Sequence, residues 1–282
     1  MYIGLDSKFF VKGLTGCQVC CTKDKFRTCI DHIEIRVNKD NYIMYGTDGY
    51  TLAVYEAPDG SIDNIVTDEP SNYPHKFYIH QSEVDIIKKI IKVYPDSKIE
   101  YSSEKKFIKI GNDNFSYTMN IKQEFNEERS KINLSESIIK KVQFNYPDVP
   151  KRGIIPVQYI NRIVLDRLEL LGILEFYDKL LGRLKLKKHK PAVLVNLTKQ
   201  YVGLMLDGDY FTNSINIKIN FTIPEKNTVI EPTTLKLSYN LFLKLVKVIK
   251  DKGMLLEFNT NQHLISMFSE DRLKYYLMVC RI

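Results

Sequence analysis

The period of the hydrophobic pattern changes repeatedly along this chain of 282 residues, and that alternation limits the folds it can adopt. Segments in which apolar residues recur at helical spacing are followed by segments in which apolar and polar residues alternate. The first pattern is typical of a helix with one buried face, and the second of a half-buried strand. Short helices separated by runs of strands predict an α+β protein built on antiparallel sheets.

The same order of elements recurs along the chain, so we expect four units that each combine a helix with an antiparallel sheet. The helices should share one face of the sheets. The expected helices cover residues 8–21, 81–93, 160–182 and 239–250. The expected strands cover residues 28–37, 41–56 (as a hairpin), 77–80, 98–101, 107–111, 115–121, 192–198, 201–207, 215–222, 234–237, 254–258, 263–268 and 274–281. The repeat lies in element order and not in residue identity.

A segment rich in proline and glycine divides the chain near its middle. Residues 146–153 read Tyr-Pro-Asp-Val-Pro-Lys-Arg-Gly, and such residues interrupt regular structure. We therefore predict two domains of similar size, 1–150 and 151–282, with two helix-plus-sheet units in each. The polar residues 122–137 are expected to form a loop ahead of this boundary.

Composition limits the compartment and the partners. A formal net charge of +7 is compatible with a polyanionic partner, but a plain basic soluble protein remains an alternative. The chain has no apolar run long enough to span a membrane and does not begin with a signal-peptide pattern. An odd number of cysteines, five in all, favours a reducing compartment. We expect a cytoplasmic protein, in the host bacterium if a phage encodes it.

Motifs for catalysis and for metal or cofactor binding are not found. The chain lacks a glycine-rich phosphate loop, His-Glu-x-x-His and Gly-x-Ser-x-Gly, so we predict neither catalytic residues nor a cofactor. The spacing of Cys17, Cys20, Cys29 and His32 suggests zinc. However, Cys29 and His32 would point to opposite faces of one strand and could not share a metal. Buried free thiols are the better interpretation, and no metal is expected.

Three segments carry a more specific pattern. Residues 45–55 read Tyr-Gly-Thr-Asp-Gly-Tyr-Thr-Leu-Ala-Val-Tyr, in which Asp48-Gly49 predicts a type I′ hairpin turn. Residues 144–149 read Phe-Asn-Tyr-Pro-Asp-Val, and the last strand ends Leu-Met-Val-Cys-Arg-Ile. In this order the segments resemble the bacterial DNA polymerase III sliding clamp. Residues 1–150 resemble the middle of the three clamp domains, residues 151–282 resemble the last, and no segment resembles the first.

The resemblance implies a DNA-clamp fold and a ring-forming processivity factor that is not an enzyme. Such a ring encircles duplex DNA without reading its sequence, binds a peptide of the DNA polymerase and is opened by a clamp loader. A two-domain chain, as in a phage or divergent clamp, would form a homotrimer if the ring keeps six domains. Two alternatives remain: a monomeric basic processivity factor, and a clamp-fold decoy that binds host replication peptides.

The resemblance also implies an interdomain pocket for the polymerase peptide. Its walls would be Thr47, Gly49, Tyr50, Thr51, Leu52, Pro147, Val149, Met278, Val279, Cys280 and Arg281. A mainly apolar pocket with a flexible methionine can adapt to different peptides. The family has His-Arg where this chain has Tyr50-Thr51, and proline where it has Val279, so its peptide preference should differ. The competing interpretation is an ordinary hairpin turn and an ordinary edge strand.

Basic side chains on the helices and in the loops after them would face DNA in the ring's hole. The candidates are Lys23, Lys25, Arg27, Lys88, Lys89, Lys92, Lys179, Arg183, Lys185, Lys187, Lys188, Lys190, Lys244, Lys247 and Lys250. Lysine is a mobile point charge that suits diffuse contact with phosphates. A charged face opposite an apolar stripe is also how any surface helix looks, so a typical lysine here could simply be solvated. The cluster at 179–190 is denser than that alternative predicts.

Overall fold

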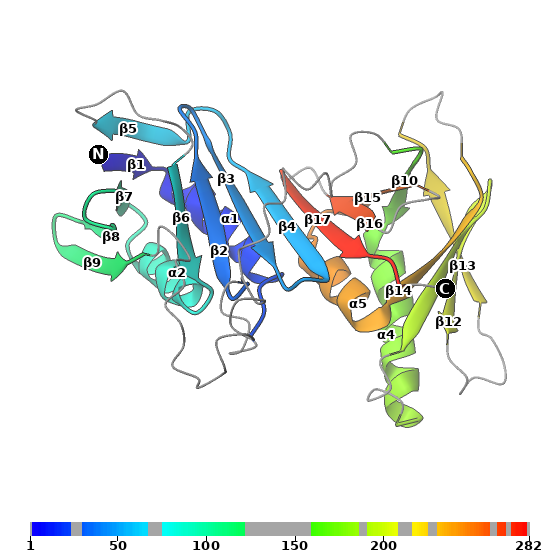
Figure 1. Cartoon of the computed structure of the whole chain (residues 1–282). Coiled ribbons are helices and arrows are strands. Elements are labelled where there is room, and N and C mark those ends of the chain that lie inside the picture. Colours follow the sequence, from blue (N-terminus) through cyan, green and yellow to red (C-terminus); the bar gives the residue numbers. More distant parts are fainter. Residues whose placement is uncertain are drawn as a thin grey trace, which may run out of the picture. The chain divides into compact units, whose positions relative to one another are not determined.

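The computed structural model describes residues 2–23, 30–66, 75–121, 159–185, 191–207, 216–224, 230–259, 264–268 and 272–280. The chain divides into two compact units, Met1–Asp148 and Val149–Ile282, which are coloured blue to green and green to red in Figure 1. The expected boundary segment and the polar stretch 122–137 lie outside the described residues. No described helix is long and apolar enough to cross a lipid bilayer.

The first unit contains two antiparallel sheets within its described residues. Their strand orders are β5-β1-β7-β8-β9 and β4-β3-β2-β6. The helices are α1 (Ser7–Gln18) and α2 (Glu83–Val93). The strands are β1 (Tyr2–Leu5), β2 (His32–Val37), β3 (Tyr42–Thr47), β4 (Thr51–Glu56), β5 (Ile62–Val66), β6 (His75–His80), β7 (Lys98–Ser102), β8 (Phe107–Asn112) and β9 (Phe115–Asn120).

Two repeats of strand, helix and three strands build this unit, and they exchange their first strands. The repeats are β1-α1-β2-β3-β4 and β6-α2-β7-β8-β9, with β5 between them. Strand β1 pairs with β7 of the second repeat, and β6 pairs with β2 of the first. Each sheet is therefore completed by a strand from the other repeat.

The second unit has the same plan. Its described strands form one sheet, β14-β11-β12-β13-β10-β15-β16-β17, in which β10 pairs with β15 and β14 with β11. The helices are α4 (Arg167–Arg183) and α5 (Tyr239–Val248). The strands are β10 (Asn161–Asp166), β11 (Ala192–Leu197), β12 (Tyr201–Asp207), β13 (Asn216–Thr222), β14 (Thr233–Ser238), β15 (Gly253–Phe258), β16 (Leu264–Phe268) and β17 (Leu273–Met278).

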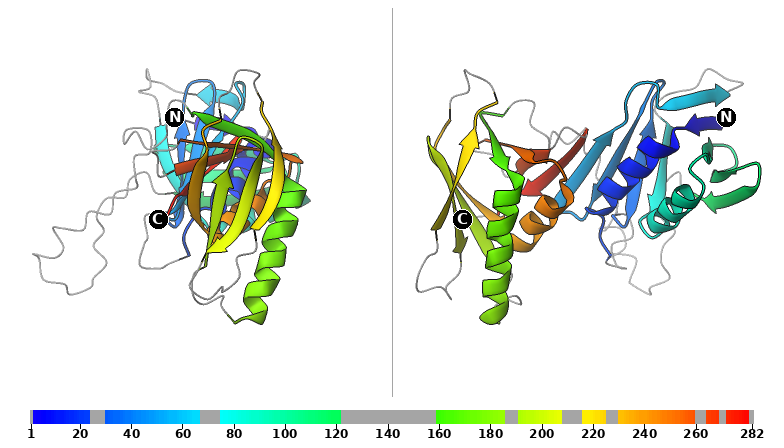
Figure 2. Two further views of the ribbon diagram at one scale, coloured as in Figure 1. Left: turned by 90° about the vertical axis from the view of Figure 1, so that its right-hand side faces the viewer. Right: turned by 180° about the vertical axis from the view of Figure 1, so that it is seen from behind.

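The helices of each unit lie together. Helix α1 contacts α2, and α4 contacts α5, so each pair shares one side of its unit, as Figure 2 shows. Buried tyrosines anchor the second pair, because the Tyr239 hydroxyl donates to the Leu174 carbonyl at 2.6 Å and the Tyr177 hydroxyl to the Leu204 carbonyl at 2.7 Å. The α+β class expected from the sequence is confirmed.

One expected helix was too long because it included a strand, and two further strands were not predicted. The helix expected over 160–182 begins only at Arg167, because Asn161–Asp166 forms β10 with alternate residues buried. Its boundary is set by Asp166, whose side chain accepts hydrogen bonds from the backbone of Leu168 and Glu169. Strands β1 and β5 were also missed, since each is only four or five residues long.

Close contact between α1 and β3 makes one glycine hard to replace. A Cβ at Gly46 would lie 2.2 Å from the backbone oxygen of Cys17, whereas a Cβ at Gly172 on α4 would meet no atom. We expect Gly46→Ala to lower the free energy of unfolding by about 1–3 kcal/mol and Gly172→Ala to raise it by about 0.5–1 kcal/mol. Urea denaturation of both variants measures these changes in the free energy of unfolding. Equal changes for the two variants would contradict the close contact between Gly46 and Cys17.

Candidate functional site

The turn between β3 and β4 is held by its own side chains. One Asp48 carboxylate oxygen accepts hydrogen bonds from the backbone N–H groups of Tyr50 (2.9 Å) and Thr51 (2.7 Å). The Thr47 hydroxyl donates to the Thr51 carbonyl at 2.7 Å and accepts from the Gly49 N–H at 3.1 Å. The Tyr50 side chain is 56% exposed. The hydrogen bonds therefore fix the backbone of the turn, while the aromatic ring of Tyr50 stays exposed.

The expected type I′ geometry is wrong. That turn needs positive φ at both central residues, but of Asp48 and Gly49 only the glycine has it, at +88°. The Asp48 carboxylate instead accepts hydrogen bonds from the backbone N–H groups of Tyr50 and Thr51, which is the Asx-turn alternative open to a short polar side chain.

The residues expected on this wall of the peptide pocket divide by exposure. Gly49 and Tyr50 are exposed, whereas Thr47, Thr51 and Leu52 are buried. The Thr51 hydroxyl is buried without a hydrogen-bond partner among the described residues. Only the tip of the turn thus offers surface to a ligand. Pro147 and Val149, expected beside it, lie outside the described residues.

The second expected wall is the end of the chain in the second unit. Met278 at the end of β17 is 46% exposed. Val279 forms a bridge with Leu237 of β14, and the Cys280 N–H donates to the Lys236 carbonyl at 2.7 Å. The main chain of this tail is therefore held against β14 while Met278 stays accessible. Arg281 lies outside the described residues.

The basic residues expected to face DNA are mostly exposed, and some of them interact with acidic side chains. Lys88 lies 3.8 Å from Asp85, and Lys247 lies 3.7 Å from Glu175 on the neighbouring helix. The others that the structure describes are exposed or half-buried on helices or just after them: Lys23, Lys89, Lys92, Lys179, Arg183, Lys185, Lys244 and Lys250. Lys25, Arg27, Lys187, Lys188 and Lys190 lie outside the described residues.

The structure adds two basic residues that sequence analysis missed. Lys8 and Lys12 lie four residues apart on α1, and this helix has no acidic residue. Their spacing places them on one face. The spacing of Lys8 and Lys12 is visible in the sequence, but the two glycines of the segment weaken its helical pattern. Helix α4, by contrast, carries Glu169, Glu175 and Asp178 as well as basic residues at both of its ends.

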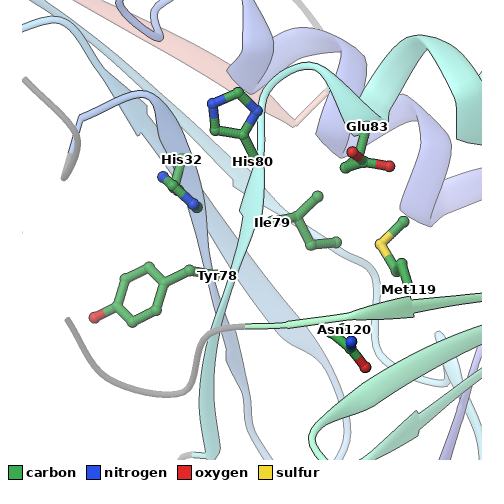
Figure 3. Close-up of a pocket in the computed structure, with 7 residues that line it drawn as sticks. All are labelled: His32, Tyr78, Ile79, His80, Glu83, Met119 and Asn120. Carbon is green, nitrogen blue, oxygen red and sulfur yellow. The ribbon is translucent and has the colours of Figure 1, made fainter. Parts of the chain in front are cut away.

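Two histidines border a pocket of about 260 Å³ in the first unit (Figure 3). Asp31 contacts both, through His32 Nδ1 and, at 3.3 Å, His80 Nε2. The backbone N–H of Ser82 donates to His80 Nδ1 at 3.2 Å, which leaves the proton of the neutral ring on Nε2, facing Asp31. The carboxylate thus ties the start of β2 to the end of β6. No group of three suitable side chains among the described residues could hold a metal.

The described cysteines are mainly buried free thiols, as expected. Cys17, Cys20 and Cys21 are buried around the end of α1, and none forms a disulfide. Burial raises the pKa of the Cys17 thiol well above its ordinary value, and the neighbouring Cys21 and Cys20 add to this. The neutral thiol is therefore favoured, which suits packing rather than reactivity. Cys29 lies outside the described residues.

Comparison with known proteins identifies the fold. Protein-family models and curated proteins give no match to the sequence. Among solved structures, the DNA polymerase III beta subunits of Pseudomonas aeruginosa and Thermotoga maritima each match with a TM-score of 0.73 at 12% identity, over 100% of this chain and 66% of theirs. The DNA polymerase sliding clamp of Caulobacter crescentus matches with a TM-score of 0.71 at 12% identity, over 100% of this chain and 65% of that one.

The expected clamp fold is thereby confirmed. At 12% identity the likeness concerns the fold, and the chain spans just under two thirds of the length of these clamp subunits.

The cap in the β3–β4 turn can be tested directly. We expect Asp48→Ala to lower the free energy of unfolding by about 1–2 kcal/mol, because two backbone N–H groups lose a charged acceptor. Asp48→Asn keeps an oxygen there and should cost less. Asp59→Ala removes an exposed aspartate that accepts one hydrogen bond from the Asn41 side chain, and should change stability by less than about 0.5 kcal/mol. Urea denaturation gives the free energy of unfolding of each variant. Equal losses for Asp48→Ala and Asp59→Ala would refute the capping role of Asp48.

Proposed function

We propose that this protein is a sliding clamp, a non-enzymatic processivity factor that encircles duplex DNA and tethers a DNA polymerase. The observation that carries the proposal is the match of the whole chain to bacterial clamp subunits. The Thr47–Leu52 turn and the tail at Met278 support it, because each presents one exposed large side chain from a fixed main chain. A phage origin stays a prediction.

The proposed ring is a homotrimer. Each chain contributes two units of the same strand–helix–strand plan. In the family that the sequence resembles, a closed ring contains six such domains. Three copies of this chain would supply six. Residues 1–150 would take the place of the middle clamp domain and residues 151–282 that of the last. Opening and loading would be the work of a separate clamp loader.

DNA would be held by diffuse attraction between the helices and the phosphates. Lysines on α2, α5 and the end of α4, together with Lys8 and Lys12 on α1, would supply positive charge without the planar guanidinium that reads bases. Contacts of this kind let a ring slide. A protein that acts through such contacts needs no set of catalytic residues.

The polymerase peptide would bind in an interdomain pocket, to which the β3–β4 turn, Pro147 and Val149, and the C-terminal tail would each contribute. Tyr50 and Met278 would contact an apolar anchor, while Thr51 and Leu52 support the turn from below. Val279, Cys280 and Arg281, which follow Met278 in the sequence, would border the same pocket.

A monomeric basic factor is the second candidate. The net charge of +7 favours it, since a protein that binds DNA by charge on one face needs no closed ring. A decoy for host replication peptides would bind the peptide with negligible DNA association. These three functions differ in how DNA binding depends on salt and on DNA ends.

Retention on DNA separates them. We expect the loaded clamp to stay on closed circular DNA in high salt and to leave when the circle is cut, because a ring is held by topology. A monomeric factor should dissociate from both forms as salt rises, following counterion release. A decoy should bind neither.

Charge reversal at Lys185, Lys187 and Lys188 should lower DNA association at physiological salt by about tenfold or more, because three phosphate contacts are replaced by repulsion. Reversal of three exposed hairpin lysines, Lys39, Lys105 and Lys199, is the matched control and should have little effect. Equal losses for both sets would contradict a DNA-facing role for the cluster after α4.

Peptide binding provides an independent check. We expect Tyr50→Ala and Met278→Ala each to weaken binding of a polymerase clamp-binding peptide by about tenfold, as loss of an apolar anchor does. Tyr2→Ala, which removes an exposed tyrosine from β1, is the control. Fluorescence polarisation with a labelled peptide measures the change. Unchanged affinity for both site variants would place the peptide elsewhere.

A further inference from the structure

The pocket drawn in Figure 3 is built by four elements of the first unit. Its lining comes from the start of β2, the end of β6, the start of α2 and the end of β9. Successive side chains of a strand point to opposite faces, so Ile79 reaches the pocket from one face of β6, and Tyr78 and His80 from the other. A volume of about 260 Å³ lies just below that of common ligand pockets and suits a group about as large as one side chain.

The histidine side of the pocket is held in place by its own contacts. Asp31 contacts His32 Nδ1 and lies 3.3 Å from His80 Nε2. The two imidazole rings meet edge to face, with 4.9 Å between their centroids. Figure 3 places Tyr78 on the same side of β6 as His32. Aromatic rings that are already fixed can bind a flat group at little cost in conformational entropy.

The charge of the pocket is negative. With both histidines neutral, Glu83 carries the formal charge of the lining, in which the structure places no lysine or arginine. Its carboxylate accepts a hydrogen bond from the Tyr117 hydroxyl at 2.9 Å and forms no ion pair with a described residue. Burial and the neighbouring Glu83 raise the pKa of Tyr117, so this hydroxyl keeps its proton and stays a donor. On a chain with a net charge of +7, this pocket therefore favours a cation.

Apolar surface lies between the polar groups. Ile79 and Met119 are buried, and Figure 3 shows their side chains between Glu83 and Asn120. Methionine adapts its shape to what it contacts. Asn120 is exposed, and its side-chain amide offers a donor and an acceptor. A ligand with a short alkyl chain and a cationic head would satisfy both kinds of surface.

We propose that this pocket binds an alkylguanidinium group, which is the chemistry of an arginine side chain. The planar head pairs with the Glu83 carboxylate, donates to the Asn120 side-chain oxygen and stacks on the aromatic rings of the histidine side. The alkyl chain packs on Ile79 and Met119. An ammonium group lacks the flat faces and the forked donors, so it fits this lining less well. The inference does not depend on the proposed clamp function.

Calorimetric titration of the full chain with butylguanidinium chloride tests the site. We expect one molecule to bind per chain, about tenfold more tightly than butylammonium. Glu83→Gln keeps an oxygen for Tyr117 but removes the charge, so it should weaken binding by about tenfold or more. Asp85→Asn is the matched control, because it removes the same charge from a neighbouring position of α2 that points elsewhere. It should leave the affinity unchanged.

A measurement on the wild-type protein keeps the proposal falsifiable if Glu83→Gln does not fold. The NMR methyl resonance of Met119, assigned with Met119→Leu, should shift as butylguanidinium is added. The methyl resonance of Met205, on β12 of the second unit, is the internal control and should not move. A Met119 resonance that stays in place at saturation would contradict binding in this pocket.

Titration with the peptide acetyl-Gly-Gly-Arg-Gly-Gly-amide identifies the source of the group. A peptide that binds as tightly as butylguanidinium supports the proposal and points to an arginine of another protein. Binding of butylguanidinium alone supports it and points to a free alkylguanidine. Failure of both to bind, equal affinity for butylammonium, or equal losses in Glu83→Gln and Asp85→Asn would overturn the proposal.

Discussion

The exchange of first strands between repeats is the constraint on which the structure depends. Strands β1 and β6 leave their own repeats to pair with β7 and β2, and β10 and β14 do the same with β15 and β11. Neither repeat can complete its sheet alone, so the two repeats of a unit are stabilised together. The helix that follows each exchanged strand must then pack beside the helix of the other repeat, which brings both to one side of the unit.

This arrangement separates three surfaces that the proposed clamp would use. The helices gather basic side chains on one side of each unit, and turns or tails present single large side chains such as Tyr50 and Met278. Among the described strands, none pairs with β9 on the side away from β8, and β10 pairs with β13 only at Phe221 and Thr222. None of these surfaces requires an unusual pKa or a reactive group. A function that depends on shape, diffuse charge and edge pairing leaves a much weaker trace in the residues than a catalytic site does.

The hydrophobic period was sufficient to predict α2, α5 and most strands, because their apolar residues have one partner surface each. It failed at β10, where alternate residues are buried as in a strand but Asn161–Asp166 continues directly into α4. The hairpin at Asp48-Gly49 was predicted, but its geometry depends on where one carboxylate finds donors, which residue type alone does not decide. The ion pair of Lys247 with Glu175 could not be predicted either, since it joins two separate helices, whereas the pair of Lys88 with Asp85 lies within α2 at a spacing of three residues.

The central claim is that copies of this chain close into a ring, and images of the wild-type protein test it most directly. Electron microscopy of negatively stained protein should show closed, three-fold symmetric particles with a central hole, and class averages should resolve six similar units around it. Particles of a single chain, open filaments or compact dimers without a hole, at concentrations where light scattering finds a stable species, would contradict the account.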